Sequence, residues 1–353
     1  MDDRSESELD IEQPGALVRY LRSRELIAAG EEPTVTVLDG GVSNRTVLVE
    51  RSGGESWVVK QALAKLRVKV DWFSDPGRIH READGLRWLR AFAPPGSITP
   101  LIFEDHQDHL LGMEAVPQPH ENWKSRLLRG DLELDHVRQF ASLIGQVHRA
   151  SNERLDELQP AFGNRDFYET LRVEPYYRYA ASQVPSSAAF YDQLIADTYA
   201  RQDTIVHGDF SPKNVLVHER KLILLDHEVI HLGDPGFDLG FGMTHLLSKA
   251  HHIHTHRTAF RDAAILFWDT YRDTVMSSGS VAWNTGLEER AVRHTLGCLL
   301  ARARGRSPLE YLDEQERDRQ DRVVTALMQR PPATISGLVS RFVSDIEREE
   351  HYV

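Results

Sequence analysis

Cysteine is almost absent from this chain of 353 residues: Cys298 is the only one, so no disulfide can form within the chain. Long apolar runs are absent too, and no stretch approaches the roughly 20 residues that a helix needs to cross a bilayer. The first residues are acidic and lack the apolar segment of a signal peptide. We therefore expect a cytoplasmic protein that does not enter a membrane.

Clusters of Lys and Arg are also missing, and the net charge is −12. Nucleic acids and anionic membrane surfaces attract clustered basic residues, so neither is expected as a partner. With 41% hydrophobic residues the chain can bury a substantial core, and its length suggests two domains or lobes. A neutral or cationic small molecule suits this composition better as a partner. The oligomeric state stays open, and a homodimer is one of the states that the sequence allows.

Residues 205–228 carry the polar groups that point to chemistry. The run His207-Gly-Asp209 comes five residues before Asn214, and two apolar strands joined by a charged turn then lead to Asp226. Such a hairpin would direct Asp209, Asn214 and Asp226 to one place. Phosphoryl transfer needs a base for the substrate hydroxyl and oxygen ligands for magnesium, and these residues fit those roles. The alternative is a hairpin in which Asp, Asn and Gly only form turns.

The spacing His-x-Asp-x-x-x-x-Asn is that of the catalytic loop of protein kinases, and Asp226 stands where their magnesium-binding Asp stands. A protein substrate is nevertheless not expected. Only residues 227–237 separate Asp226 from Asp238, which leaves no room for an activation loop and a peptide-binding segment. The pattern therefore favours a small-molecule acceptor.

The N-terminal part predicts a small lobe, residues 1–116. An amphipathic helix is expected over 16–29 and a second helix over 78–92. β-branched or alternating segments separated by turn residues predict a five-stranded antiparallel sheet with one main helix on it. The strands are expected at 34–38, 46–50, 56–61, 99–104 and 110–114.

The remainder, residues 117–353, predicts a larger and mainly helical lobe that contains the hairpin. The stretch Val116-Pro117-Gln118-Pro119 is the natural connector between the lobes. The fold class expected is thus α+β with two lobes. Helices are expected at 132–150, 187–201, 257–275, 286–304 and 315–329.

A nucleotide site is expected in the N-terminal lobe. Gly40 and Gly41 occupy a turn between strands, where free backbone N–H groups can approach phosphate oxygens, and Ser43 and Asn44 add donors. A glycine pair between strands is also an ordinary hairpin turn.

Lys60 lies on an apolar strand and needs an anion. In kinases such a Lys holds the phosphates and is itself held by a Glu on the following helix, here Glu82. The alternative is a Lys that reaches solvent from an edge strand and a Glu on a solvated helix face. Glu114 and Val116 end the last strand where a kinase hinge would meet adenine, although the same segment could be core packing.

Taken together, these motifs resemble those of the aminoglycoside phosphotransferase and choline kinase family over about residues 34 to 245. That resemblance implies a protein-kinase-like fold with two lobes and the use of ATP and Mg²⁺. The most specific parts are His207-Gly-Asp209-x-x-x-x-Asn214, Asp226-His-Glu228 and Asp234-Pro-Gly-Phe-Asp238-Leu-Gly.

The same resemblance assigns roles to single residues. It implies that Asp209 is the catalytic base, that Asn214 and Asp226 bind magnesium, and that Glu228 joins the metal. Asp238 is expected to brace the catalytic loop through backbone hydrogen bonds. A catalytically silent nucleotide-binding protein or scaffold is the alternative, although all the usual catalytic positions hold competent residues.

Within the family the chain most resembles the 5-methylthioribose kinases, through Val-Val-Lys60-Gln-Ala-Leu, Asp-x-Glu and Gly-Phe-Asp-x-Gly. It departs from them over residues 229–235, where those kinases have an aromatic-rich stretch. A methylthioribose-like sugar, an aminoglycoside and an amino alcohol all remain candidate acceptors, and the preference for ATP over GTP stays open. Arg302 and Arg304 either recognise substrate or complement a helix dipole.

The tract His251-His252-Ile-His254-Thr-His256 has the composition of a metal site. No cysteine lies nearby, and a surface loop or helix start would explain it equally well.

Overall fold

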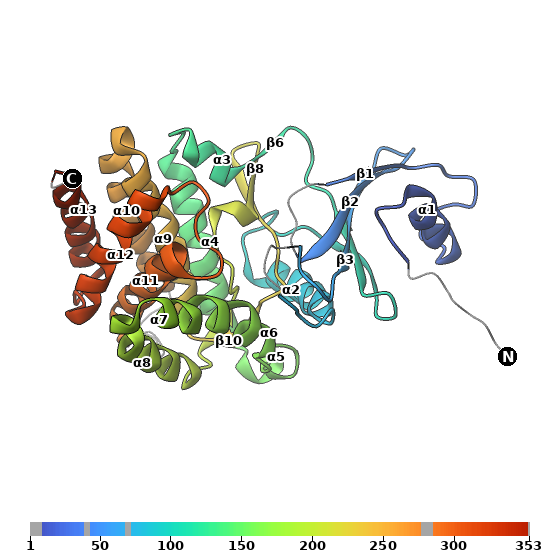
Figure 1. Cartoon of the computed structure of the whole chain (residues 1–353). Helices are drawn as coiled ribbons and strands as arrows, with labels where there is room; N and C mark the ends of the chain where they lie inside the picture. The colour runs from blue at the N-terminus through green and yellow to red at the C-terminus, as the bar shows by residue number, and fades with distance from the viewer. Residues whose placement is uncertain (1–8, 39–42, 68–71, 277–284, 352–353) are drawn as a thin grey trace.

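Five antiparallel strands form the sheet of the N-terminal lobe (N-lobe) in the order β1-β2-β3-β5-β4 (Figure 1). The computed structural model describes residues 9–38, 43–67, 72–276 and 285–351. All five strands match the predicted segments to within two residues at each end. They are β1 (Thr34–Val37), β2 (Asn44–Glu50), β3 (Ser56–Ala62), β4 (Leu101–Asp105) and β5 (Leu110–Glu114).

Two helices, not one, pack on this sheet, on opposite sides: α1 (Pro14–Ser23) and α2 (Arg78–Phe92). Strand side chains alternate between faces, so Trp57 and Val59 pack with Leu17 of α1. Lys60 therefore points to the α2 side. The expected main helix is α2, and α1 is the predicted N-terminal helix, which covers the other face of the sheet.

The first helix is also shorter than the predicted 16–29. It ends at Ser23, and Glu25 takes a left-handed conformation with φ of 57°. Ile27 is buried in the same cluster as α1, but it reaches the sheet from the loop that follows the helix. Apolar spacing alone could not distinguish this loop from a further helical turn.

Helices make up most of the C-terminal lobe (C-lobe), and the five predicted helices are present to within two residues at each end. We propose that the lobes join at Val116-Pro117, between β5 and β6. The five are α4 (Leu134–Asn152), α8 (Ala188–Tyr199), α10 (Arg257–Met276), α11 (Leu287–Arg304) and α12 (Glu314–Gln329).

Other C-lobe helices were not predicted. In α9 (Gly236–His252) every residue from Gly236 to His251 is buried, so the helix has no polar face to reveal its period. By contrast, α13 (Ile335–His351) buries a regular apolar stripe that periodicity could have found. The others are α3 (Trp123–Leu128), α5 (Leu155–Phe162), α6 (Asp166–Tyr168), the π-helix η1 (Glu169–Arg178), α7 (Tyr179–Gln183), and the 3₁₀ turns η2 (Pro185–Ser187), η3 (Pro212–Asn214) and η4 (His254–His256).

Short strands hold the predicted hairpin against the helices. In a three-stranded sheet, β8 (Val215–His218) pairs with both β6 (His120–Asn122) and β9 (Lys221–Leu224). A second pair joins β7 (Thr204–Val206) to β10 (His231–Gly233). The segments before and after the hairpin are thus fixed to each other.

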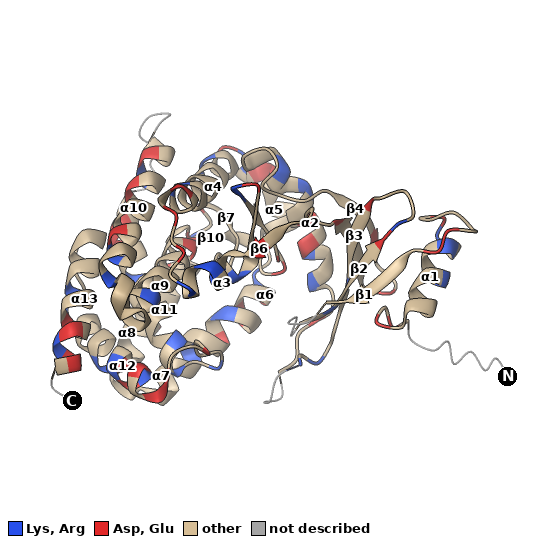
Figure 2. Cartoon of the chain, turned by 90° about the horizontal axis from the view of Figure 1, so that it is seen from above, with Lys and Arg blue, Asp and Glu red and all other residues tan. Residues whose placement is uncertain are grey.

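Charged residues of both signs are interspersed over both lobes (Figure 2). In the part of the chain that the structure describes, no helix combines the length and the apolar character required to span a membrane.

Candidate active site

The catalytic loop, residues 207–214, leaves β7 and is fixed by a carboxylate of α9. Asp238 accepts hydrogen bonds from the backbone N–H of His207 at 2.7 Å and of Gly208 at 2.9 Å. These are the backbone hydrogen bonds that we expected of Asp238. Gly208 has a φ of 77°, and a Cβ there would lie 2.9 Å from Val229, so this turn requires glycine.

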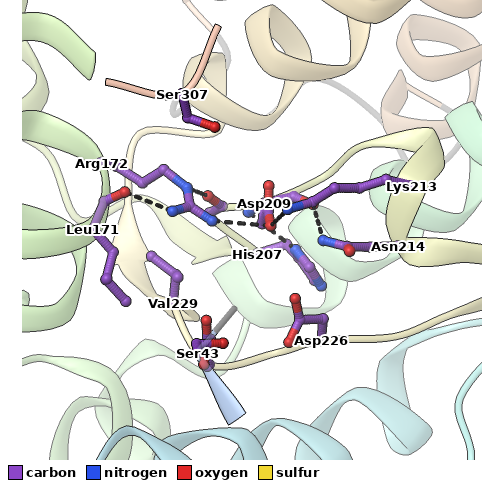
Figure 3. A network of polar contacts seen from close by, with 12 residues as sticks. Ser43, Leu171, Arg172, His207, Asp209, Lys213, Asn214, Asp226, Val229 and Ser307 are labelled. Atoms are coloured by element: carbon purple, nitrogen blue, oxygen red, sulfur yellow. Dashed lines mark hydrogen bonds and ion pairs between the residues drawn. The ribbon is translucent and has the colours of Figure 1, made fainter. Parts of the chain in front are cut away.

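Asp209 lies between two cations. Its Oδ2 is 3.0 Å from Arg172 Nη2 and 3.0 Å from Lys213 Nζ, as Figure 3 shows. Its Oδ1 is buried and has no hydrogen-bond partner among the described residues. Burial raises the pKa of Asp209, but Arg172 and Lys213 outweigh that effect and hold the pKa well below its usual range. The carboxylate is therefore ionised, with one oxygen free.

Asn214 and Asp226 face the same cavity as Asp209. The Nδ2 of Asn214 donates to the Asp209 carbonyl at 3.0 Å, which closes the loop. Asp226 follows β9 in a left-handed conformation with φ of 68°, and its Oδ1 lies 3.2 Å from Lys60 Nζ. Burial raises the pKa of Asp226, but Lys60 and Lys213 lower it below its ordinary value. The structure thus brings together the three groups of the predicted hairpin.

Lys60 is nearly buried, and its Nζ lies 2.6 Å from Glu82 Oε1 on α2. The predicted contact between strand and helix is present. Burial favours the neutral amine, but Glu82 and Asp226 raise the pKa of Lys60 above its usual value. Lys60 is therefore a fixed positive charge.

Glu228 is buried beside Arg78, with its Oε2 at 3.2 Å from Arg78 Nε. Asn44 donates to the same oxygen at 3.3 Å. Burial, followed by the charge of Asp226, raises the pKa of Glu228. The same side-chain amide of Asn44 donates to the Ser43 hydroxyl at 3.3 Å. The predicted turn residues Gly40 and Gly41 lie outside the described residues.

A histidine pair connects the loop to the segment that follows the second strand of the hairpin. His207 Nε2 lies 3.1 Å from His227 Nδ1, and both side chains are buried. Gly85 of α2 lies directly against His227, because a Cβ at Gly85 would come within 2.7 Å of the His227 Cβ. The helix that carries Glu82 therefore packs directly on the segment after β9 that carries Asp226 and His227.

Two cavities meet at this site. One, of about 510 Å³, lies under the N-lobe sheet and reaches Glu114 and Val116. The other, of about 740 Å³, is lined by Asp209, Asn214, Asp226 and Glu228 among others. Lys60 and Thr46 line both cavities, so the two spaces are adjacent at Lys60. We call them the sheet cavity and the loop cavity.

Sequence reasoning missed several residues of the loop cavity. Arg172 comes from the π-helix, 37 positions before Asp209 (209 − 172), where no motif marks it. Lys213 lies inside the motif, four residues after Asp209, and its position was a usable signal. Others that line the cavity are Trp72, Lys124, Tyr176, Arg306, Ser307 and Glu310.

Arg302 and Arg304 line neither cavity. Arg302 donates to the Ser307 carbonyl at 2.6 Å and supports the wall of the loop cavity from behind. Arg304 binds acidic residues of α12, including Asp321 at 2.8 Å. Both lie in the last turn of α11, where the alternative placed them as partners of the helix dipole.

The histidine tract at the end of α9 contacts acidic residues of the C-lobe. His252 Nδ1 lies 2.8 Å from Glu316, and His254 Nε2 lies 3.5 Å from Glu350. Among the described residues, no metal-like group of three includes any histidine of this tract. The tract spans the last residues of α9 and the turn η4 before α10, and His251 is buried, so the surface loop of the alternative is found only in part.

Comparison with known proteins agrees with this architecture. The model of the phosphotransferase enzyme family (APH) matches residues 34–273. Methylthioribose kinase 2 of Oryza sativa subsp. japonica is 24% identical over 263 residues, which is 66% of this chain and 61% of that protein. The chain spans about three fifths of the length of the curated relatives it matches.

Solved structures are similar over nearly the whole chain. Macrolide 2'-phosphotransferase MphH of Brachybacterium faecium has a TM-score of 0.50 at 15% identity and covers 90% of this chain and 98% of its own. A choline/ethanolamine kinase family protein of Mesorhizobium loti has a TM-score of 0.50 at 12% identity and covers 94% and 99%. At such identities these structures show the fold alone, and they confirm the predicted protein-kinase-like fold. Because the family model matches more than half of its residues, the chain belongs to the phosphotransferase enzyme family.

Proposed function

We propose that this protein is an ATP- and Mg²⁺-dependent kinase that phosphorylates a hydroxyl group of a small molecule. One observation carries the proposal: an ionised Asp209, with one oxygen free, faces the same cavity as Asp226, next to Lys60. Membership of the phosphotransferase family supports it.

The sheet cavity suits the nucleotide. Its volume of about 510 Å³ falls in the range of small-ligand sites, and apolar side chains such as Val58, Met113 and Leu216 line it. We propose that the backbone of Glu114 and Val116 binds adenine at the far end. At the near end Lys60, held by Glu82, would bind the phosphates.

The oxygen donors beyond Lys60 suit magnesium, which prefers carboxylate and amide oxygens. Asp226 is a better candidate ligand than Glu228 because its side chain is 25% exposed to the cavity. Asn214 lines the same cavity. Glu228 is already bonded to Arg78 and Asn44, so we assign it a supporting role. Bound there, Mg²⁺ would neutralise negative charge on the transferred phosphoryl group.

Asp209 would orient the acceptor hydroxyl and take its proton. The unpartnered Oδ1 is the oxygen available for that hydrogen bond, because Oδ2 is held by Arg172 and Lys213. The low pKa of Asp209 keeps its carboxylate ionised but makes it a weak base. Proton transfer is therefore expected late, after the bond to the phosphoryl group has largely formed.

The charges of the loop cavity indicate an uncharged acceptor. Every carboxylate that lines it lies within 4 Å of a basic side chain: Asp209 of Arg172, Asp226 of Lys60, Glu228 of Arg78 and Glu310 of Lys124. A polycation such as an aminoglycoside would find no unpaired carboxylate among these residues. We therefore propose a neutral polyhydroxyl compound, such as a methylthioribose-like sugar.

A coupled ADP-release assay against sugars, amino alcohols and aminoglycosides tests the proposal. We expect turnover with a neutral sugar, and Asp209→Ala should lower kcat by about 10²–10⁴-fold while nucleotide affinity, measured by calorimetry, stays unchanged. The exposed Asp135→Ala is the control and should behave as wild type. Turnover by Asp209→Ala at the wild-type rate would show that Asp209 is not the base. A preference for aminoglycosides would contradict the proposed acceptor.

The same assay without acceptor separates an enzyme from a silent nucleotide-binding protein. Slow Mg²⁺-dependent ATP hydrolysis should be measurable in wild type and absent in Asp226→Ala. A protein that binds ATP but shows neither hydrolysis nor transfer with any acceptor would support the silent alternative.

A further inference from the structure

Three histidines and one glutamate gather on the N-lobe, outside both cavities. His80 lies in the first turn of α2, and Glu104 lies in β4. His106 and His109 come from the turn between β4 and β5. None of the four lines the sheet cavity or the loop cavity, so the proposed kinase reaction does not use them.

The side chains converge on one carboxylate oxygen. Glu104 Oε1 lies 2.6 Å from His80 Nδ1 and 3.1 Å from His106 Nε2. The rings of His80 and His106 stack with centroids 3.9 Å apart and planes at 11°. The three atoms lie within 4.8 Å of one another. The ligand atoms of a tetrahedral Zn²⁺ at about 2.1 Å lie about 3.4 Å apart, so these three atoms are close enough to share one ion once the stacked rings turn their nitrogens toward it.

The surroundings of His80 match those of a metal ligand. A histidine that binds metal through one ring nitrogen almost always has a hydrogen-bond partner on the other. Here His80 Nε2 lies 3.1 Å from His109 Nδ1, which leaves Nδ1 for the ion.

Glu104 is also positioned from its other side. Arg87 of α2 donates to Oε2, which leaves Oε1 toward the two imidazoles. The nearby charge of Arg87 weakens the attraction of the carboxylate for a cation. The two imidazole nitrogens must therefore supply the remaining binding free energy. This donor set of two imidazoles and one carboxylate suits Zn²⁺, whereas Mg²⁺ prefers oxygen ligands alone.

We propose that His80, Glu104 and His106 form a Zn²⁺ site, with water as the fourth ligand and His109 orienting His80. Such an ion would tie the first turn of α2 to the β4–β5 turn. His80 is two residues before Glu82, so the site would hold the helix that positions Lys60. The site would stabilise the N-lobe and is independent of the acceptor.

Calorimetry and thermal unfolding of the chelator-treated, untagged full chain test this site with Zn²⁺ alone. We expect one Zn²⁺ per chain in the micromolar range and a higher Tm, with no comparable effect of Mg²⁺. His106 is the best ligand to remove, because its side chain is 75% exposed. His106→Ala should weaken Zn²⁺ binding more than tenfold, and His109→Ala by about 10–100-fold. Circular dichroism and nucleotide affinity should be unchanged in both variants.

The exposed His254→Ala is the matched control, because it removes a histidine from the C-lobe tract. It should bind Zn²⁺ as wild type does. If Zn²⁺ binding is lost in His254→Ala and kept in His106→Ala, the ion binds elsewhere and the proposal is wrong. If wild type binds no Zn²⁺ at millimolar concentration, the cluster is a hydrogen-bonded group only, and the proposal is likewise wrong.

Discussion

Arg172 of the π-helix holds the catalytic loop at two points, because one nitrogen lies 3.0 Å from the Asp209 carboxylate while another donates to the Gly208 carbonyl at 2.5 Å. Removal of this cation should raise the pKa of Asp209 and let its side chain move. We expect Arg172→Met to lower kcat by about 10²-fold or more, with little change in nucleotide affinity. Steady-state kinetics with varied ATP and varied acceptor measures both.

Two further variants make that experiment decisive. Arg172→Lys keeps the charge but cannot make both contacts, so its kcat should lie between those of wild type and Arg172→Met. Arg178→Met changes an arginine at the other end of the same π-helix, whose side chain is 51% exposed, and should leave kcat unchanged. Equal loss in Arg172→Met and Arg178→Met would point to the helix and not to the contact with Asp209.

The ion pair between Lys60 and Glu82 should act on the nucleotide. Glu82→Gln keeps the shape but removes the charge that holds Lys60 in place at 2.6 Å. A hydrogen bond to a charged group contributes about 1.5–3 kcal/mol, so we expect the KM for ATP to rise about 10–100-fold. The KM for the acceptor should change little, and a rise confined to the acceptor would refute the assignment of the sheet cavity to the nucleotide.

Asp238 should matter for stability as well as for rate. In Asp238→Asn one buried backbone N–H of the catalytic loop loses its acceptor, because the amide side chain has only one oxygen. An unsatisfied buried group costs about 1–3 kcal/mol, and the free energy of unfolding should fall by that amount. Chemical denaturation of Asp238→Asn beside the exposed Asp135→Asn measures it. Unchanged stability would mean that the loop keeps its shape without this carboxylate.

Acid should weaken the fold partly through His231. Burial lowers its pKa from 6.5 to about 4, and its ring also stacks on Tyr168. The unfolded chain binds a proton below pH 6.5 and the folded chain only below about 4. The stability due to neutral His231 is therefore present above pH 6.5 and is lost as the pH falls to 4, by at most about 3 kcal/mol.

His231→Gln removes that titration, so its free energy of unfolding should fall less between pH 7 and pH 4 than that of wild type. The exposed His254→Gln should keep the wild-type slope. Parallel curves for His231→Gln and wild type would exclude the contribution of His231.

Much of the fold was predictable because local patterns survive in it. The N-lobe strands alternate between two faces, and helices with one solvated side show their period, as in α4 and α12. Asp209, Asn214 and Asp226 could be assigned to one site because β8 and β9 follow each other in the sequence and pair as a hairpin. The contact of Lys60 with Glu82 could be predicted because the helix follows the strand in the sequence.

The remainder depends on contacts between distant segments. Arg172 reaches Asp209 from a π-helix whose spacing matches neither of the usual periods. Arg78 gave no signal as the partner of Glu228, since 150 positions separate them. Helix α9 is buried all round, so its sequence lacks the alternation on which prediction relies.

The meeting of the two cavities at Lys60 has a consequence for how such a protein can change. The walls of the sheet cavity come mostly from segments before Pro117, whereas Arg172, Tyr176, Arg306 and Ser307 of the loop cavity come from segments far after it. Replacing residues 171, 173–176 and 306–310, with Arg172 kept, should thus retarget the proposed kinase to a new acceptor while its donor half stays intact. These two stretches are short, so directed evolution confined to them can test every pair of substitutions.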